Sequence, residues 1–159
     1  MKTLLSAATL ALALLSLPFS AHTASATKVV VQISDDAPRT WNIALNNADN
    51  VLAAIPGAEV EIVVYGPGIG MLKAESTVAN RVAKAVSSGI KVVACENTIR
   101  KAKLNPQDMH ADIGYVPSGV VEIMAQQGDG WSYLRPWVSL CSQKGPLNSG
   151  PFFATTPAA

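Results

Sequence analysis

Three short runs of mostly apolar residues, rich in valine and isoleucine, occur at residues 28–33, 60–65 and 90–94. Within each run the apolar residues largely follow one another instead of alternating with polar ones. This pattern is typical of strands that are covered on both faces, as in a parallel sheet. The three runs therefore predict three buried strands, and they limit the chain to a fold that can cover both faces of a sheet.

The segments between these runs have the spacing of amphipathic helices. The first helix is expected to begin near Pro38, where a proline suits the first turn, and Asp36 is placed to cap it. Pro56 stops this helix, and a second helix is expected over residues 78–86. The apolar positions of the first helix are Trp41, Ala44, Leu45, Ala48, Leu52 and Ile55.

Shorter elements complete the alternation. A short helix is expected over residues 97–103, and another follows the turn at 117–119. The apolar residues of that last helix are Val120, Ile123 and Met124. The run 131–134 is a final strand, expected at a sheet edge because Pro136 follows it closely. Strands that alternate with helices through short connections predict a three-layer α/β fold with a mainly parallel sheet of about five strands.

The N-terminus has the three-part layout of a secretory signal peptide. Lys2 supplies a positive charge, residues 4–17 are apolar apart from serine and threonine, and Ala24-Ser25-Ala26 reads as a small-x-small cleavage site. The apolar run falls short of the ~20 residues that a transmembrane anchor needs. We therefore expect cleavage after Ala26 and a periplasmic or secreted protein, with no membrane contact after cleavage.

The remaining chain divides into one α/β domain over residues 27–137 and a loose tail over 138–159, where five of the last 16 residues are proline or glycine. Without Lys2 the 12 basic residues become 11 and equal the 11 acidic ones. A neutral domain has no field to attract nucleic acid. His110 is then the single histidine and no C-x-x-C occurs, so we expect no metal site, no cofactor and no histidine-based triad.

Three groups of polar residues follow the ends of predicted strands. Ligands of open parallel sheets bind beyond the carboxyl ends of the strands, so these groups are the candidate site. The groups are Ser34 with Asp35 and Asp36, Tyr65 with Gly66, and Cys95 with Glu96 and Asn97. Helix capping is the favoured explanation of the acidic pair. Gly66-x-Gly68-x-Gly70 does not have the G-x-G-x-x-G spacing of a dinucleotide site.

Cys95 is the strongest candidate for chemistry. A cysteine between a strand end and a helix start meets the partial positive charge of the helix N-terminus, which stabilises the nucleophilic thiolate. Arg100 is placed to add positive potential, whereas the Glu96 carboxylate would oppose it by raising the thiol pKa. Only four residues separate Cys95 from Arg100, one fewer than a cysteine phosphatase loop needs. The alternative is that Cys95 is a small buried apolar residue that ends a core strand.

At Cys95 the chain resembles the DsrE/DsrF-like proteins. The resemblance rests on VVACENTIR at residues 92–100, GYVPSGVVEI at 114–123 and GWSYLRP at 130–136, and it extends over about residues 28–136. It implies a flavodoxin-like α/β subunit that assembles into homotrimers or hexamers. It also implies a persulfide on the cysteine that matches Cys95, exchanged with sulfur-donor or sulfur-acceptor proteins. The Pro117-Ser118-Gly119 segment is its second specific part.

Two functions remain open at this point. The first is a sulfur carrier or thiol-dependent sulfur transferase that uses Cys95 as the persulfide acceptor. The alternative is a non-catalytic, oligomeric module that binds a small ligand or a protein in the periplasm. Export favours disulfides, and a bridge from Cys95 to Cys141 would block the thiol. Because Cys141 begins the tail, we expect it to be mostly unpaired.

Overall fold

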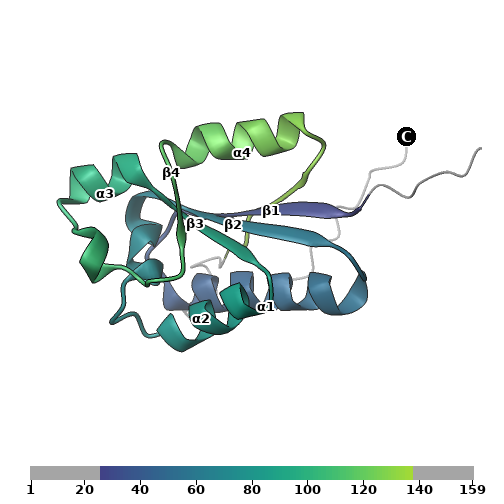
Figure 1. Cartoon of the computed structure of the whole chain (residues 1–159), viewed down its shortest axis with the longest axis horizontal. Helices are drawn as coiled ribbons and strands as arrows, with labels where there is room; N and C mark the ends of the chain where they lie inside the picture. Colours follow the sequence, from purple (N-terminus) through teal and green to yellow (C-terminus); the bar gives the residue numbers. More distant parts are fainter. Residues whose placement is uncertain (1–25, 138–159) are drawn as a thin grey trace, which may run out of the picture.

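The computed structural model describes residues 26–137. Nearly all of the expected signal peptide (1–26), the whole expected tail (138–159) and Cys141 lie outside the described residues. The described chain forms a five-stranded sheet in the order β4-β3-β2-β1-β5, and every strand pair is parallel (Figure 1). The strands are β1 (Lys28–Ile33), β2 (Glu59–Val64), β3 (Lys91–Cys95), β4 (Gly114–Val116) and β5 (Ser132–Leu134). The predicted α/β fold with a parallel sheet is confirmed.

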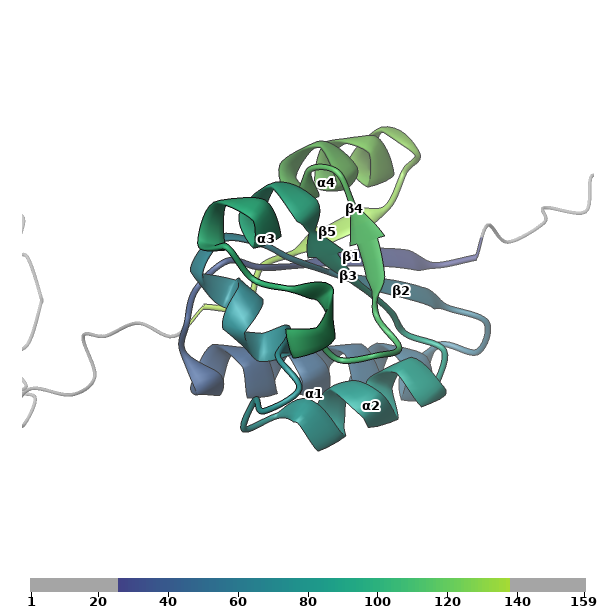
Figure 2. The ribbon, with the colours of Figure 1, turned by 60° about the vertical axis from the view of Figure 1, so that its left-hand side comes forward.

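Helices cover both faces of the sheet, which is why the central strands are continuously apolar. Helices α1 (Pro38–Ala54) and α2 (Ala79–Ser87) lie on one face, and α4 (Gly119–Gly128) lies on the other (Figures 1 and 2). Helix α3 (Glu96–Ala102) lies beyond the carboxyl end of β3. Two 3-10 helices complete the described chain, η1 (Gly66–Leu72) and η2 (Pro106–Asp108).

The two faces of the sheet bury different amounts of apolar surface. The larger cluster lies under α1 and α2 and includes Val29, Val31 and Ile33 of β1. The cluster under α4 is small and consists of Val30, Val63, Val93, Val116 and Ile123. Because side chains alternate along a strand, Cys95 shares the α4 face with Val93. The candidate thiol therefore lies at one end of the smaller apolar cluster, the one under α4.

Three local expectations are wrong. Asp36 does not cap α1, because the N-cap residue is Ala37, whose N–H donates to Asp35 Oδ1 at 3.1 Å. Ile55 lies just past the last turn of α1 and is 38% exposed, so it is not part of the buried stripe. Of the expected apolar residues of α4, Ile123 alone is buried, while Val120 and Met124 face solvent.

Two elements of the structure were not predicted from the sequence. The glycine-rich turn after β2 is the 3-10 helix η1. Strand β4 has only three residues and was not among the expected apolar runs. The run at residues 131–134 does form an edge strand, β5, beside β1. No helix in residues 26–137 is long and apolar enough to cross a bilayer.

Close packing of η1 against β1 gives a test of the fold. A Cβ on Gly68 would lie 2.9 Å from the Ile33 carbonyl oxygen, whereas a Cβ on Gly70 would meet Trp41 at an ordinary 3.5 Å. We expect Gly68→Ala to lower the free energy of unfolding by about 1–3 kcal/mol, because backbone must move to admit the methyl group. Urea denaturation should show a much smaller effect for the matched variant Gly70→Ala. Equal effects of the two variants would contradict the packing of η1 on β1.

Candidate functional site

Cys95 is the last residue of β3 and also the N-cap residue of α3, so no loop separates strand from helix. Its side chain is a free thiol, and the residue is 5% exposed. The first N–H groups of a helix have no partner within the helix, and here they open directly onto the residue that carries the sulfur. This position is the one expected from the sequence.

The start of a second helix lies beside Cys95 because β4 pairs with β3. Cys95 and Val116 are register partners, and the Asn97 N–H donates to the Pro117 carbonyl oxygen at 3.3 Å. Helix α4 then begins at Gly119, only three residues after Val116. The N-termini of α3 and α4 therefore converge at the same sulfur atom, which adds a second helix to the single one expected from the sequence.

These two helix starts set the protonation of the thiol. Burial is the largest single influence and raises the pKa of Cys95, because it disfavours the charged form. Hydrogen bonds from the Gly119 N–H, from the hydroxyl and N–H of Thr98 and from the Asn97 N–H act in the opposite direction. The net result is a pKa of Cys95 below its ordinary value. The arrangement favours a thiolate, the form of cysteine that acts as a nucleophile.

Thr98 is a site residue that the sequence analysis missed. Its Oγ1 accepts the Gly66 N–H at 3.0 Å, and its hydroxyl group hydrogen-bonds to the Cys95 sulfur. Thr98 thus links the start of η1 to the thiol, and Gly66 takes part through its backbone. The available signal was the spacing Cys95-x-x-Thr98, which puts a hydroxyl at the third helical position, where it can reach back to the N-cap residue.

Tyr65 forms one wall beside the thiol. A Cβ on Gly119 would lie 3.1 Å from Tyr65 Cδ1 and 3.2 Å from a methyl group of Val63, so a larger residue at the start of α4 would have to displace these side chains. Burial, chiefly, raises the pKa of the Tyr65 phenol, with a smaller contribution from Tyr133. Tyr65 is therefore a neutral hydroxyl at neutral pH.

Ser34 lies near the Tyr65 hydroxyl and works against the rise in its pKa. The Ser34 Oγ accepts a hydrogen bond from Gln32 Nε2 at 3.1 Å, and Gln32 Oε1 accepts one from the Tyr133 hydroxyl at 2.6 Å. A row of polar groups thus runs across the carboxyl ends of β5, β1 and β2 toward Cys95. Asp35 is held at the start of α1, where its carbonyl oxygen accepts the Trp41 Nε1 hydrogen at 2.8 Å.

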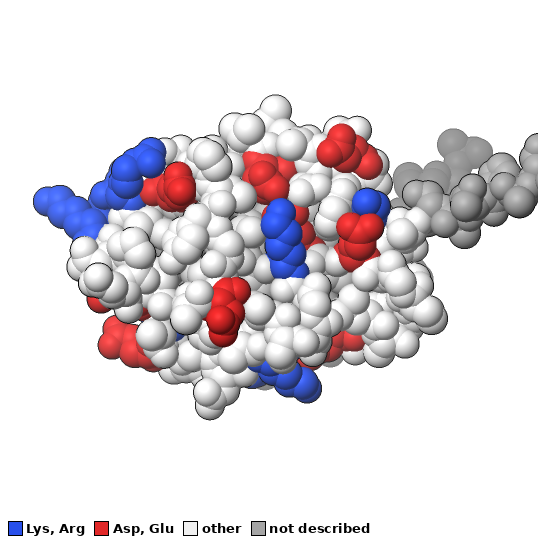
Figure 3. Space-filling view, viewed as in Figure 1, with Lys and Arg blue, Asp and Glu red and all other residues white. Residues whose placement is uncertain are grey.

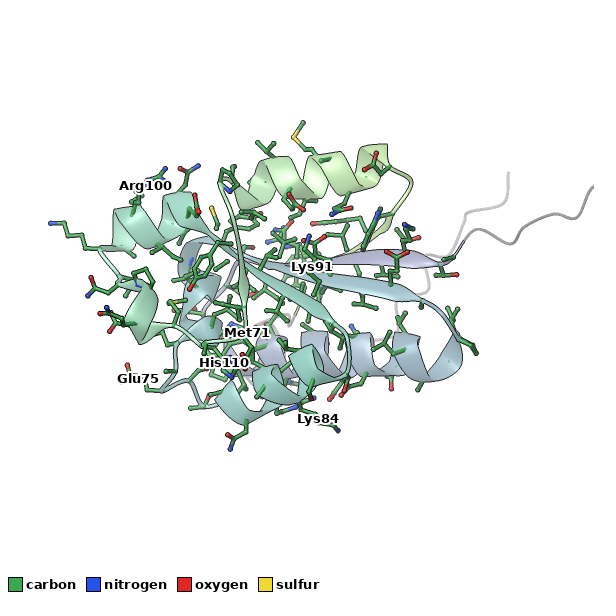
Figure 4. All side chains as sticks on the ribbon, in the orientation of Figure 1. Met71, Glu75, Lys84, Lys91, Arg100 and His110 are labelled. Carbon is green, nitrogen blue, oxygen red and sulfur yellow. The ribbon has the colours of Figure 1, made fainter. Side chains whose placement is uncertain are left out.

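The expected charged neighbours point elsewhere. The Arg100 side chain is 68% exposed, and its guanidinium contacts Asn97 Oδ1 and, at 4.0 Å, Glu96 Oε2 (Figure 4). Glu96 and Arg100 therefore interact with each other on the outer surface of α3. Asn97 contributes to the thiol through its backbone N–H. Ser118 is the N-cap residue of α4 but makes no capping hydrogen bond through its side chain.

Two surface hollows flank α3. One, of about 460 Å³, is lined by Tyr65, Gly66, Pro67, Thr98, Lys101 and Ala102. The other, of about 510 Å³, is lined by Glu96, Ile99, Arg100, Leu104, Pro106 and Tyr115. The first shares Thr98, Tyr65 and Gly66 with the surroundings of the thiol, so it is the hollow that borders the site. Among residues 26–137 no group of three or more His, Cys, Asp or Glu side chains is arranged to hold a metal ion.

The sequence profile of the DsrE/DsrF-like family matches residues 23–136, most of the chain. The protein belongs to the DsrE/DsrF-like family. The resemblance at Cys95 is thus confirmed at the level of the family, which suggests a role related to sulfur relay. A search of curated proteins gave no match.

Two solved structures support the DsrE-like fold. A protein of unknown function, MTH1491 from Methanobacterium thermoautotrophicum, is 29% identical, with a TM-score of 0.67 over 69% of this chain and 99% of that one. BT1422 from Bacteroides thetaiotaomicron, also of unknown function, is 15% identical, with a TM-score of 0.58 over 68% of this chain and 93% of that one. The second likeness bears on the fold alone.

The Thr98 hydroxyl gives a direct test of the site. We expect Thr98→Val to raise the thiol pKa by about one unit, because one hydrogen bond to the charged sulfur is lost while the shape is kept. The pKa is read from the alkylation rate with iodoacetamide as a function of pH, in a Cys141→Ser background so that a single thiol reacts. Arg100→Gln should leave the profile unchanged. A shift with Arg100→Gln and none with Thr98→Val would contradict the geometry.

Proposed function

We propose that the protein is an exported sulfur carrier that holds a sulfane sulfur as a persulfide on Cys95. The observation that carries this proposal is the convergence of N–H groups from α3 and α4 on a nearly buried sulfur whose pKa is lowered. Such donors stabilise the attacking thiolate, and the same donors suit the anionic persulfide that forms from it. Membership of the DsrE/DsrF-like family supports the same chemistry.

The transfer requires no oxidant or reductant. The Cys95 thiolate attacks the outer sulfur of a donor persulfide, a new S–S bond forms at Cys95, and the donor S–S bond breaks. The donor leaves as a thiolate and carries away the electron pair of the broken bond. An acceptor thiolate then attacks the outer sulfur on Cys95 and restores the Cys95 thiolate. The hollow beside Thr98 and Tyr65 is the proposed approach for donor and acceptor.

We propose that partner proteins bind to exposed apolar side chains of α4. Val120, Val121 and Met124 are exposed on α4, the helix that contacts the thiol. Acidic and basic side chains are interspersed over the face seen in Figure 3 rather than gathered by sign. We propose that this apolar surface is covered in a homo-oligomer, trimeric or hexameric, or by a sulfur-donor or sulfur-acceptor protein.

The same exposed surface favours a second candidate function. In that alternative the protein is a non-catalytic, oligomeric binding module in the periplasm, and Cys95 has a packing role only. The two functions differ in their dependence on the sulfur atom. Sulfur loading needs the thiol of Cys95, whereas assembly through α4 does not.

Sulfur loading of Cys95 is the decisive measurement. After incubation with a small persulfide donor, intact-mass analysis should show one added sulfur atom on the wild-type protein. The adduct should be absent from Cys95→Ser, which keeps the size of the side chain, and should remain in the matched variant Cys141→Ser. Absence of the adduct from the wild-type protein with every donor tried would exclude the carrier and leave the binding module.

Export gives a separate expectation. Protein purified from the exported fraction of the producing cells should begin at Thr27, as read by N-terminal sequencing, because the expected signal peptide ends at Ala26. A chain that retains residues 1–26 in that fraction would refute cleavage at this position.

A further inference from the structure

A fully buried carboxylate lies under α4, away from the thiol. Glu61 of β2 has 0% of its surface exposed. Its Oε1 lies 3.0 Å from Lys91 Nζ, and its Oε2 accepts a hydrogen bond from Gln126 Nε2 at 2.5 Å. Burial, chiefly, raises the pKa of Glu61, and Lys91 opposes that rise. A carboxylate in this position is costly to bury, and replacement by an apolar residue would suit a valine-lined layer.

The network around Glu61 joins the sheet to the second half of α4. Gln126 also donates to Glu122 Oε1 at 3.0 Å, and Lys91 Nζ lies 3.6 Å from the same Glu122 oxygen. Figure 4 shows Lys91 on the α4 side of the sheet. The charged groups that face Glu61 are therefore Lys91 from β3 and Glu122 from α4, with Gln126 as the neutral donor.

The distance from Glu61 to Tyr65 along β2 is similar to the distance from Gln126 to Gly119 along α4. On the α4 face, Glu61 is the register partner of Lys91, and Tyr65 and Cys95 lie four residues further along their strands, about 13 Å away. On α4, Gln126 lies seven residues after Gly119, about 10.5 Å along the axis. When Gln126 binds Glu61, Gly119 is thus brought to the level of Cys95.

The apolar contacts of α4 with the sheet lack direction. Ile123 packs against the valines of β1, β2 and β3, and a valine-lined surface permits sliding because the hydrophobic effect is non-directional. Val120, Val121 and Met124 face solvent and add nothing to the contact with the sheet. A hydrogen bond has a strict distance and angle, so the bond between Gln126 and Glu61 can fix the helix along its axis.

We propose that Glu61 is a positioning residue, which through Gln126 holds α4 at the height where the Gly119 N–H reaches the Cys95 sulfur. The inference rests on the proposed role of Cys95 as a thiolate. It adds that the reactivity of this thiolate is set in part by a carboxylate two helical turns away from Gly119. Nothing in the sequence around Cys95 indicates this dependence.

The test removes the hydrogen bond between Gln126 and Glu61 and measures the pKa of the Cys95 thiol. Gln126→Met keeps the length and the helical preference of the side chain but cannot donate to Glu61. We expect the thiol pKa to rise by about one unit, and the alkylation rate at pH 7 to fall up to about tenfold, in a Cys141→Ser background. The pH profile of alkylation with iodoacetamide gives both values, and circular dichroism with urea denaturation establishes that the variant is folded.

Matched variants separate positioning from general stability. Glu61→Leu should reproduce the shift, whereas Glu61→Gln should stay close to wild type, because an amide still offers an oxygen to Lys91 and can bond to Gln126. Gln127→Met changes an exposed neighbour on the same helix, and Glu59→Gln changes an exposed carboxylate on the same strand, paired with Lys28. Both controls should leave the profile unchanged.

The outcomes distinguish the two proposals. A lowered wild-type pKa that Gln126→Met and Glu61→Leu leave in place would overturn the positioning role, even if both variants are less stable. A shift of equal size with Gln127→Met would also overturn it. An ordinary pKa of Cys95 in the wild-type protein would instead refute the thiolate role on which the proposed function depends.

Discussion

The site depends on placing backbone N–H donors around a sulfur atom that is almost excluded from water. Burial alone would keep Cys95 protonated, because the charged form loses its hydration. The donors at the starts of α3 and α4, with the Thr98 hydroxyl, replace that hydration and reverse the effect. Their geometry is set by secondary structure rather than by flexible side chains. Exposed Arg100 could not substitute for them, since solvent screens its charge.

The topology of the sheet produces this geometry with few specific residues. The carboxyl ends of adjacent parallel strands lie at the same edge of the sheet, so pairing of β3 with β4 brings the starts of the two following helices together. Each helix needs only to begin close to the end of its strand: α3 begins directly after β3, and α4 begins after a two-residue turn. Gly119 completes the arrangement, because any larger residue would meet Tyr65 and Val63.

The sequence predicts those parts of the molecule that depend on local pattern. The continuous apolar runs predict the three central strands, and the position of Cys95 at a strand end follows from them. The pairing of β4 could not be foreseen, because three residues with one buried side chain carry no periodicity. The resemblance singles out Gly119 in the sequence, but the contact of its N–H with Cys95 depends on that non-local pairing. Thr98 could have been found from its spacing to Cys95. Arg100 was expected to add positive potential at the thiol, but its side chain points to solvent, because spacing in sequence does not fix the direction of a side chain.

The shortness of β4 has a consequence for access to the thiol. Cys95 is 5% exposed, and β4 is the three-residue edge strand whose pairing with β3 brings α4 to it. An opening that separates β4 from β3 uncovers the sulfur and at the same moment withdraws the Gly119 N–H from it. The same opening also removes the burial that raises the thiol pKa, while the donors of α3 stay in place. Access to the sulfur and the surroundings that set its protonation therefore depend on the same three-residue strand.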